Sequence, residues 1–124
     1  MRVGIDFDRV LFKTDRFKRK VLFQNIDGFE ETYSKINGVY SPKKHAEKLG
    51  IPKEKIFESL DKASEYLYDD VSSLEDSEHE FILVTRGDPV FQEEKVERSG
   101  ILKFVDDHVV VQDRAKDVKN IDFL

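Results

Sequence analysis

The feature that most constrains the fold is a run of apolar residues at positions 81–85. The run reads Phe81-Ile82-Leu83-Val84-Thr85, is partly β-branched and has the length of a strand. A continuous apolar run of this length is typical of a strand buried on both faces, as in a parallel sheet. Gly87 follows, and then Asp88-Pro89, where an aspartate cap before a first-turn proline predicts a helix ending at Gly100.

Two further segments predict strands on either side of this one along the chain. Residues 3–7 carry apolar side chains at Val3, Ile5 and Phe7, and a third strand is predicted within 104–111. Strand, helices, strand, helix, strand is the order of a parallel sheet with right-handed crossovers. We therefore expect an α/β fold with a Rossmann-like three-layer core.

The segment between the first two strands has no strand-like alternation and is predicted to form several helices. Ser41-Pro42 is an N-cap followed by a first-turn proline, and Gly50 is a natural helix end. We expect this segment to form a small helical cap inserted into a core that is short at its C-terminus. The expected boundaries are 1–12 and 75–124 for the core and 13–74 for the cap.

Composition excludes several classes of function. At 124 residues the chain is expected to form one domain, and its net charge of −5 disfavours binding of nucleic acid by bulk electrostatics. Cysteine is absent, which excludes disulfides and thiolate zinc sites. No signal segment or membrane-spanning apolar run is visible, so we expect a cytoplasmic protein with no membrane partner. The oligomeric state is left open.

Asp6 and Asp8 lie two residues apart where the first predicted strand ends. At the carboxyl edge of an open α/β sheet both carboxylates can approach one ligand. Such a pair suits Mg²⁺, which prefers carboxylates together with phosphate oxygens. One carboxylate can attack phosphorus while the other handles protons. The plain alternative is that two acidic residues end an edge strand, because this spacing is a weak pattern on its own.

Other residues further along the chain are candidates for binding phosphate. Thr85 ends the second predicted strand beside the start of a helix, where its hydroxyl can donate to a phosphate oxygen, and Arg86 follows it. Lys116 comes after the third strand and can neutralise charge on a transferring phosphoryl group, with Lys119 as a rival for the same role. A turn-capping threonine and a solvated lysine are the plain alternatives.

In their order and setting these features resemble the haloacid dehalogenase superfamily. Residues 3–10 resemble its first motif, hhhDxDx(T/V), in which h is an apolar residue. Residues 81–85 resemble its second motif, an apolar strand that ends in Thr or Ser, and Lys116 resembles the lysine that follows its third strand. The helical segment resembles the cap that this family inserts after its nucleophile. The resemblance covers nearly the whole chain.

The resemblance implies a magnesium-dependent phosphatase that acts on a small phosphorylated molecule through an aspartyl-phosphate. Asp6 would be the nucleophile. Asp8 would protonate the leaving group and then activate water, while its backbone carbonyl helps to hold Mg²⁺. Thr85 would bind the phosphoryl oxygens and Lys116 would offset their charge. Dehalogenases of the family lack the second aspartate, so Asp8 favours phosphate chemistry.

The sequence departs from the family pattern in two places. Arg9 stands where a small residue is common, and we expect its side chain to turn to solvent. The acidic motif that follows a fourth strand and completes the magnesium site is missing. The pair at 106–107 precedes the third strand and does not take that role, whereas Asp113 and Asp117 are possible stand-ins.

Two other functions stay open on the sequence. A non-catalytic or shortened relative would bind a phosphorylated ligand or partner without turnover. A receiver-type phospho-acceptor domain would need an acceptor aspartate at the end of a buried strand, for which Asp69 and Asp70 are the nearest candidates. The substrate itself is not readable, and sugar phosphates, nucleotides and phospho-acids are all compatible.

Overall fold

The computed structural model describes residues 2–111. The predicted phosphate lysine Lys116, its rival Lys119 and the possible stand-in carboxylates Asp113 and Asp117 lie outside the described residues. Within residues 2–111, no helix combines the length and the apolar character needed to cross a membrane.

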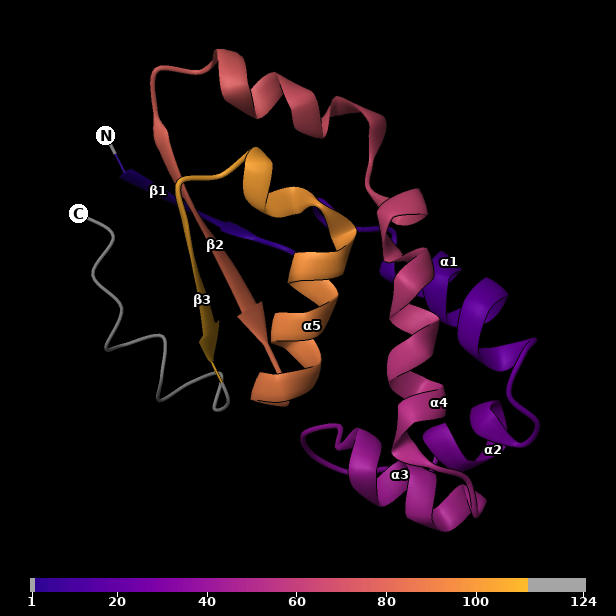
Figure 1. The fold of residues 1–124 in the computed structure, drawn as a ribbon. Helices are drawn as coiled ribbons and strands as arrows, with labels where there is room; N and C mark the ends of the chain where they lie inside the picture. The colour runs from indigo at the N-terminus through magenta and orange to yellow at the C-terminus, as the bar shows by residue number, and fades with distance from the viewer. Residues whose placement is uncertain (1, 112–124) are drawn as a thin grey trace.

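Three parallel strands form one sheet in the order β1-β2-β3 (Figure 1). They are β1 (Arg2–Asp6), β2 (Glu80–Arg86) and β3 (Asp107–Val111). β2 is the middle strand and its four central residues are buried, as the apolar run predicts. The predicted α/β class with a parallel sheet is confirmed, and β3 occupies the last five residues of the predicted segment 104–111.

The register of the sheet brings the predicted polar residues to one edge. Asp6, the last residue of β1, lies beside Val84 of β2, and Thr85 is the next residue along β2. Because parallel strands end on the same side, the residues that follow β1 and β2 meet at the carboxyl edge of the sheet. This is the edge at which ligands bind in open α/β folds.

Helix α5 (Pro89–Ser99) follows β2 and lies between the sheet and the helical segment (Figure 1). Its start is capped as predicted, because the Asp88 side chain accepts a hydrogen bond of 2.9 Å from the Phe91 amide. The helix ends at Gly100, which adopts the left-handed conformation with φ 82° that favours glycine. A short 3₁₀ turn, η4 (Ile101–Lys103), leads into β3.

The segment between β1 and β2 is helical throughout, in several short pieces. Ser41 caps the start of one of them and Gly50 ends it, both as predicted. The helices are α1 (Thr14–Phe17), η1 (Lys18–Phe23), α2 (Phe29–Tyr33), α3 (Pro42–Leu49), α4 (Lys53–Glu58), η2 (Ser59–Tyr66) and η3 (Asp69–Asp76). We refer to residues 14–76 as the helical cap.

One hydrophobic core runs from the sheet into the helical cap. Phe7 and Phe12, on the loop after β1, are fully buried and stack with ring centroids 4.9 Å apart. Phe12 also packs on Phe17 of α1, while Leu60 of η2 lies in the same buried cluster as Val96 of α5. The cap is therefore packed on α5 through shared apolar side chains, which hold it beside the carboxyl edge of the sheet.

The receiver-type alternative does not survive the structure. Asp69 and Asp70 are exposed and begin η3, a 3₁₀ helix, whereas a phospho-acceptor aspartate would have to end a buried strand. The residues before them form η2, which ends at Tyr66.

Candidate functional site

A tight turn after β1 places Asp6 and Asp8 at the edge of the sheet. The Phe7 amide still donates to the carbonyl of Val84 in the neighbouring strand, and the chain then reverses. The amides of the next three turn residues, Val10, Leu11 and Phe12, all donate to the carbonyl of Phe7. Asp6 therefore ends β1, and Asp8 lies on the turn by which the chain leaves the sheet.

Three side chains donate hydrogen bonds to the carboxylate of Asp8. The Nζ of Lys95 lies 2.8 Å and the Oγ1 of Thr14 lies 3.0 Å from Oδ1. The Nε2 of Gln92 lies 3.1 Å from Oδ2. Thr14 begins α1 of the cap, whereas Gln92 and Lys95 come from α5. Asp8 therefore joins three parts of the molecule, and these bonds fix the orientation of its carboxylate.

The environment of Asp8 favours its ionised form. Burial alone raises the pKa of this carboxyl, but the charge of Lys95 and the hydrogen bonds from Lys95, Thr14 and Gln92 outweigh burial and leave the pKa below its usual value. Burial lowers the pKa of Lys95, and the adjacent carboxylate of Asp8 offsets only part of that effect. Asp8 is consequently a carboxylate at neutral pH and is better suited to accept a proton than to donate one.

Lys95 sits in an aromatic cage. Its side chain is only 8% exposed, and its ammonium lies 5.8 Å from the ring centroid of Phe7, 5.5 Å from that of Phe12 and 5.8 Å from that of Phe91. A lysine buried among rings is costly unless a carboxylate and the ring faces compensate its charge. Both compensations are present here, and they hold the ammonium beside Asp8.

Thr85 is connected to Asp8 through Gln92. Its hydroxyl is fully buried and accepts a hydrogen bond from the same Gln92 Nε2 that donates to Asp8. Gly87 makes room for this glutamine, because a Cβ at that position would lie 3.2 Å from the Gln92 Cγ. The structure therefore places Thr85 behind the site, in contact with Gln92, and its predicted contact with phosphate stays a prediction.

Asp6 is the more accessible of the two aspartates. Its side chain is 45% exposed, and Oδ1 accepts a hydrogen bond of 3.0 Å from the Phe7 amide. The Nη1 of Arg86 lies 3.8 Å from Oδ2 of Asp6. The Nε of Arg86 is buried and has no hydrogen-bond acceptor within the described part of the chain. Arg86 thus brings a positive charge next to Asp6.

Arg9 is turned to the surface, as predicted. Its guanidinium pairs with Asp15, with Nη2 3.0 Å from Oδ1 and Nε 3.2 Å from Oδ2, and both side chains are largely exposed. Its φ of 66° lies in the left-handed region, which is unusual for a residue other than glycine.

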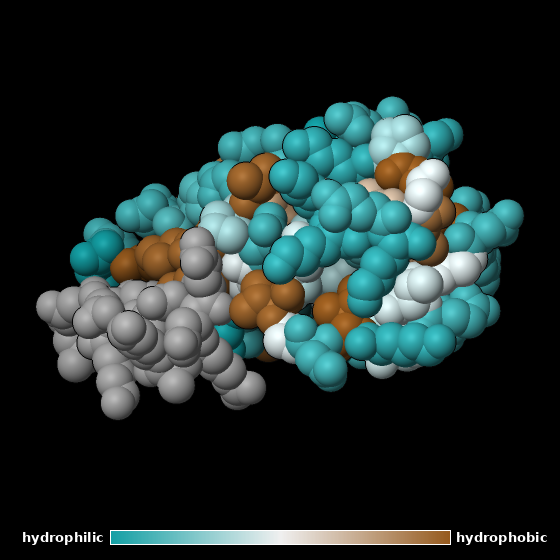
Figure 2. Space-filling view, turned by 90° about the horizontal axis from the view of Figure 1, so that it is seen from below, coloured by the Kyte–Doolittle hydropathy of each residue, from teal (hydrophilic) through white to brown (hydrophobic). Residues whose placement is uncertain are grey.

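A cleft of about 970 Å³ opens between the carboxyl edge of the sheet and the helical cap. Asp6, Asp8, Arg86 and Lys95 line its core side, whereas Thr85 does not reach its wall. The strands β2 and β3 run toward the lower end of Figure 1, and Figure 2 shows the molecule from that side. Apolar residues are visible there between hydrophilic ones, so this face is not uniformly polar.

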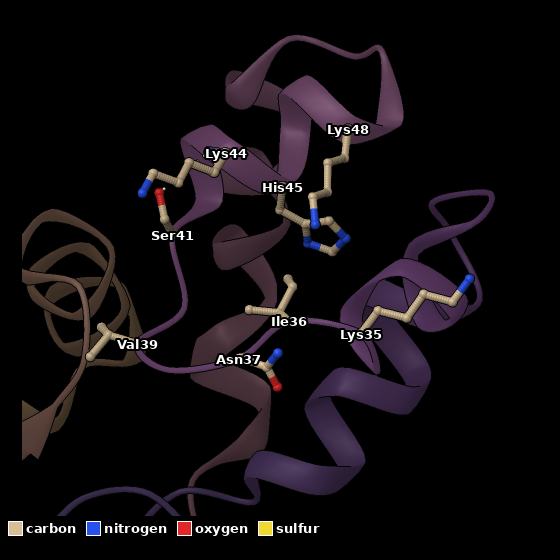
Figure 3. Close-up of a pocket in the computed structure, with 8 residues that line it drawn as sticks. All are labelled: Lys35, Ile36, Asn37, Val39, Ser41, Lys44, His45 and Lys48. Atoms are coloured by element: carbon tan, nitrogen blue, oxygen red, sulfur yellow. Dashed lines mark hydrogen bonds between the residues drawn. The ribbon is translucent and has the colours of Figure 1, made fainter.

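A second hollow, of about 260 Å³, lies on the cap beside α3 (Figure 3). Lys35, Lys44 and Lys48 line it, but Figure 3 shows that the side chains of Lys35 and Lys44 point in opposite directions. The ring of His45 is held by the Tyr40 hydroxyl at 2.7 Å and by Thr32 at 2.6 Å. With no convergent charge and a histidine whose nitrogens are occupied, this hollow does not form a second site.

No family model matches the sequence, and no curated protein matches it. The structure does resemble solved structures. A haloacid dehalogenase-like family hydrolase from Xanthomonas campestris matches with a TM-score of 0.53 at 17% identity, over 94% of this chain. At this identity the likeness is one of fold alone. The chain spans 64% of the length of that hydrolase.

The acidic pair at 106–107 lies away from the cleft. Oδ2 of Asp106 accepts a hydrogen bond of 2.7 Å from the Phe81 amide near the start of β2. That contact lies at the amino end of the strand, opposite Asp6. The expectation that this pair does not complete the site is therefore met.

Magnesium has a limited set of oxygen donors in the described residues. Within residues 2–111, no three His, Asp or Glu side chains gather as a metal site. The Asp8 carboxylate already accepts hydrogen bonds from three side chains. The oxygen ligands that remain for Mg²⁺ are the carboxylate of Asp6 and the backbone carbonyl of Asp8, to which the resemblance assigns this role. Mg²⁺ commonly keeps several waters and takes only one or two carboxylates plus substrate phosphates. The donors fit an ion held jointly with a phosphate group.

Lys95 and Gln92 are the site residues that the sequence reasoning missed. The helix that carries them was predicted, and its buried residues are Phe91, Gln92, Lys95, Val96 and Ser99. These positions repeat at helical spacing and form one face. The signal in the sequence was that Gln92 and Lys95 lie on the buried face of a helix that starts at the sheet edge. Buried polar groups need polar partners, which predicts contacts with the site.

Proposed function

We propose that this protein is a magnesium-dependent phosphatase that hydrolyses phosphate monoesters of small molecules through an aspartyl-phosphate on Asp6. The observation that carries the proposal is the pair of aspartates at the cleft. Asp6 is accessible and lies beside Arg86, whereas Asp8 is locked to Lys95. An accessible carboxylate next to cations suits attack on an anionic phosphorus centre.

In the first step, a carboxylate oxygen of Asp6 forms a bond to phosphorus while the bond from phosphorus to the ester oxygen breaks. The leaving oxygen takes a proton that comes from the Lys95 ammonium and passes through the Asp8 carboxylate, because Asp8 itself is ionised. In the second step, water attacks the phosphorus of the aspartyl-phosphate, the bond to Asp6 breaks, and the water proton returns to the pair. Because the pKa of Asp8 is lowered, the carboxylate is ionised and can accept a proton in the second step.

The cations of the site have separate roles in this proposal. Arg86 offsets charge on the phosphoryl oxygens, because its guanidinium lies beside Asp6 at the cleft. Lys95 holds Asp8 in place and shares its proton. Mg²⁺, which the Asp6 carboxylate and the Asp8 backbone carbonyl would hold, would supply further positive charge to the phosphoryl group. Thr85 supports the site through Gln92, and direct contacts of Thr85 and Lys116 with phosphate remain predictions of the resemblance.

The test is hydrolysis of p-nitrophenyl phosphate with and without Mg²⁺ by the wild-type chain and by Asp6→Asn. Asp76→Asn is the matched control, because Asp76 is exposed and lies at the end of η3, outside the cleft. The expected result is turnover that requires Mg²⁺, is lost in Asp6→Asn and is kept in Asp76→Asn. Turnover that survives in Asp6→Asn would exclude Asp6 as the nucleophile.

A binding-only role is the second candidate, and the occupied carboxylate of Asp8 favours it. A protein of this kind would be stabilised against heat by Mg²⁺ and a phosphate mimic such as orthovanadate, without turning over any ester. Loss of that stabilisation in Asp6→Asn, together with no hydrolysis, would replace the phosphatase with this role.

A further inference from the structure

The cleft has two chemically different sides. The core side carries six charged residues, which are Asp6, Asp8, Arg9, Arg86, Asp88 and Lys95. On the cap side, most of the lining residues are aromatic or aliphatic, and they come from α1, η1, α2 and the loop that follows α2. Of the apolar lining residues of the cap, Phe17, Leu22 and Phe29 are buried in the core, whereas Tyr33, Val39 and Tyr40 are at least partly exposed.

Three aromatic rings connect the apolar side to the carboxylates. The rings of Tyr33 and Tyr40 have centroids 5.4 Å apart, and the Tyr40 ring meets Phe91 of α5 edge-on at 5.6 Å. Phe91 directly precedes Gln92, which donates to Asp8. A ligand whose phosphate lies at Asp6 therefore has an aromatic surface available along the same cleft.

The cap side offers few polar groups to a ligand. The hydroxyl of Tyr40 is already bonded to His45, and that of Thr14 is already bonded to Asp8. This leaves the hydroxyl of Tyr33 and the ammonium of Lys18, which lies 5.0 Å from the Tyr33 ring centroid. The part of a ligand that contacts this side therefore meets ring and methyl surface more than hydrogen-bonding groups.

Two exposed valines add to the apolar character of the cleft. Val10, on the loop after β1, is 51% exposed and Val39, on the loop after α2, is 55% exposed, and both line the cleft. They belong to the core side and the cap side respectively. Lys18 has no carboxylate partner among residues 2–111, so it adds positive charge that complements an anionic ligand.

We infer that the substrate is a phosphate monoester whose alcohol part carries a flat aromatic ring, of the chemical class of a nucleoside monophosphate. The phosphate lies at Asp6 and Arg86, and the ring packs against Tyr33 and the two valines. The inference rests on the proposed function for the phosphate end only. For the ring end of the substrate, the inference rests on the exposed tyrosine and valine side chains and on the small number of polar groups on the cap side.

The experiment compares adenosine 5′-monophosphate with ribose 5-phosphate, because the two share the phosphate and sugar and differ in the base. We expect the wild-type kcat/KM to be about tenfold higher for the nucleotide, since stacking of a base on an aromatic side chain is commonly worth that factor or more. Tyr33→Ala should remove the preference, and Tyr33→Phe should keep it. The readout is the ratio of the two kcat/KM values in each variant, so that a general loss of activity is not taken for a loss of preference.

Binding is measured separately on Asp6→Asn by calorimetry, so that the readout does not depend on turnover. Tighter binding of the nucleotide than of ribose 5-phosphate would support the inference if that difference is lost when Tyr33→Ala is added. This holds even if the wild type hydrolyses neither ester. Absence of hydrolysis would remove only the proposed function. Equal hydrolysis and equal binding of the two esters would overturn the inference and leave the phosphatase intact. A preference that persists in Tyr33→Ala would also overturn it.

Discussion

The ammonium of Lys95 lies 2.8 Å from the carboxylate of Asp8, although the two residues are 87 positions apart in the sequence. Lys95 projects from α5 into a cage of three phenylalanine rings. Asp8, on the turn after β1, contacts the ammonium there. This pair links the middle of α5 to the loop that carries both aspartates. Stability, pH dependence and activity should therefore all depend on this pair.

Replacing Lys95 by Met should weaken both the fold and the site. Methionine has a similar length and fits among the rings, but it leaves the buried carboxylate of Asp8 without its cation. Breaking a buried ion pair by removing one partner commonly costs about 3–5 kcal/mol, which urea denaturation would measure. Lys62→Met, which removes an exposed lysine paired with Glu65, is the matched control and should cost less than about 1 kcal/mol.

The same substitution should move the pH dependence of catalysis. Without Lys95, burial is no longer outweighed, so the pKa of Asp8 rises. The acidic limb of the kcat/KM profile should therefore shift to higher pH in Lys95→Met. An unshifted limb in a folded variant would show that Asp8 does not control it.

The Asp8 pair should also make stability depend on pH. The pKa of Asp8 is lower in the folded chain than in the unfolded chain, where an aspartate has a pKa of about 3.9. The pair therefore contributes its full stability above roughly pH 4, and the contribution is lost as pH falls through the lower folded pKa. In urea titrations, the difference in unfolding free energy between the wild type and Asp8→Asn should shrink as the pH is lowered below that point. A difference that stays constant would contradict the assignment.

Gly87→Ala should disturb Gln92 and, through it, Asp8. The φ of 139° at Gly87 is rarely adopted by residues with a side chain, and the new Cβ would lie 3.2 Å from the Gln92 Cγ. We expect a loss of about 1–3 kcal/mol in stability together with a loss of activity. Gly50→Ala carries a comparable backbone cost at φ 69° but meets no atom within 4 Å, so it should lose stability without losing activity.

Arg9→Ala should have little effect on either property. The guanidinium pairs with Asp15 at the surface, where an ion pair contributes about 0–1 kcal/mol. Alanine bears the same backbone cost at φ 66° as arginine does, so that term cancels. Hydrolysis of p-nitrophenyl phosphate at moderate ionic strength should be unchanged, and a large loss would place Arg9 in contact with the substrate.

The local features of the fold were predictable because each depends on neighbours in the sequence. The apolar run at 81–85 predicts β2, and Asp88-Pro89 and Gly100 predict both ends of α5. The same holds for the cap helix that starts after Ser41 and ends at Gly50. Turn and cap chemistry acts over a few residues, so a single sequence suffices to read it.

The predictions for the site were less complete, and Thr85 shows why. Its place at the end of β2 beside Asp6 was predicted from the strand pattern. That its hydroxyl would be buried against Gln92, rather than open to the cleft, depends on how α5 packs on the sheet. Burial of an individual polar group is a property of packing, and no local pattern states it.

By itself, the sequence determined the order of strands and helices, the helix caps, and the position of Asp6 and Asp8 at the edge of a parallel sheet. Only the tertiary structure decided that Lys95, one of 21 lysines and arginines, becomes the partner of Asp8. It also decided that the cap presents tyrosine rings to the cleft. The physical reason is range: periodicity and capping act along the chain, whereas an ion pair across 87 residues forms only when packing of α5 buries both charges together.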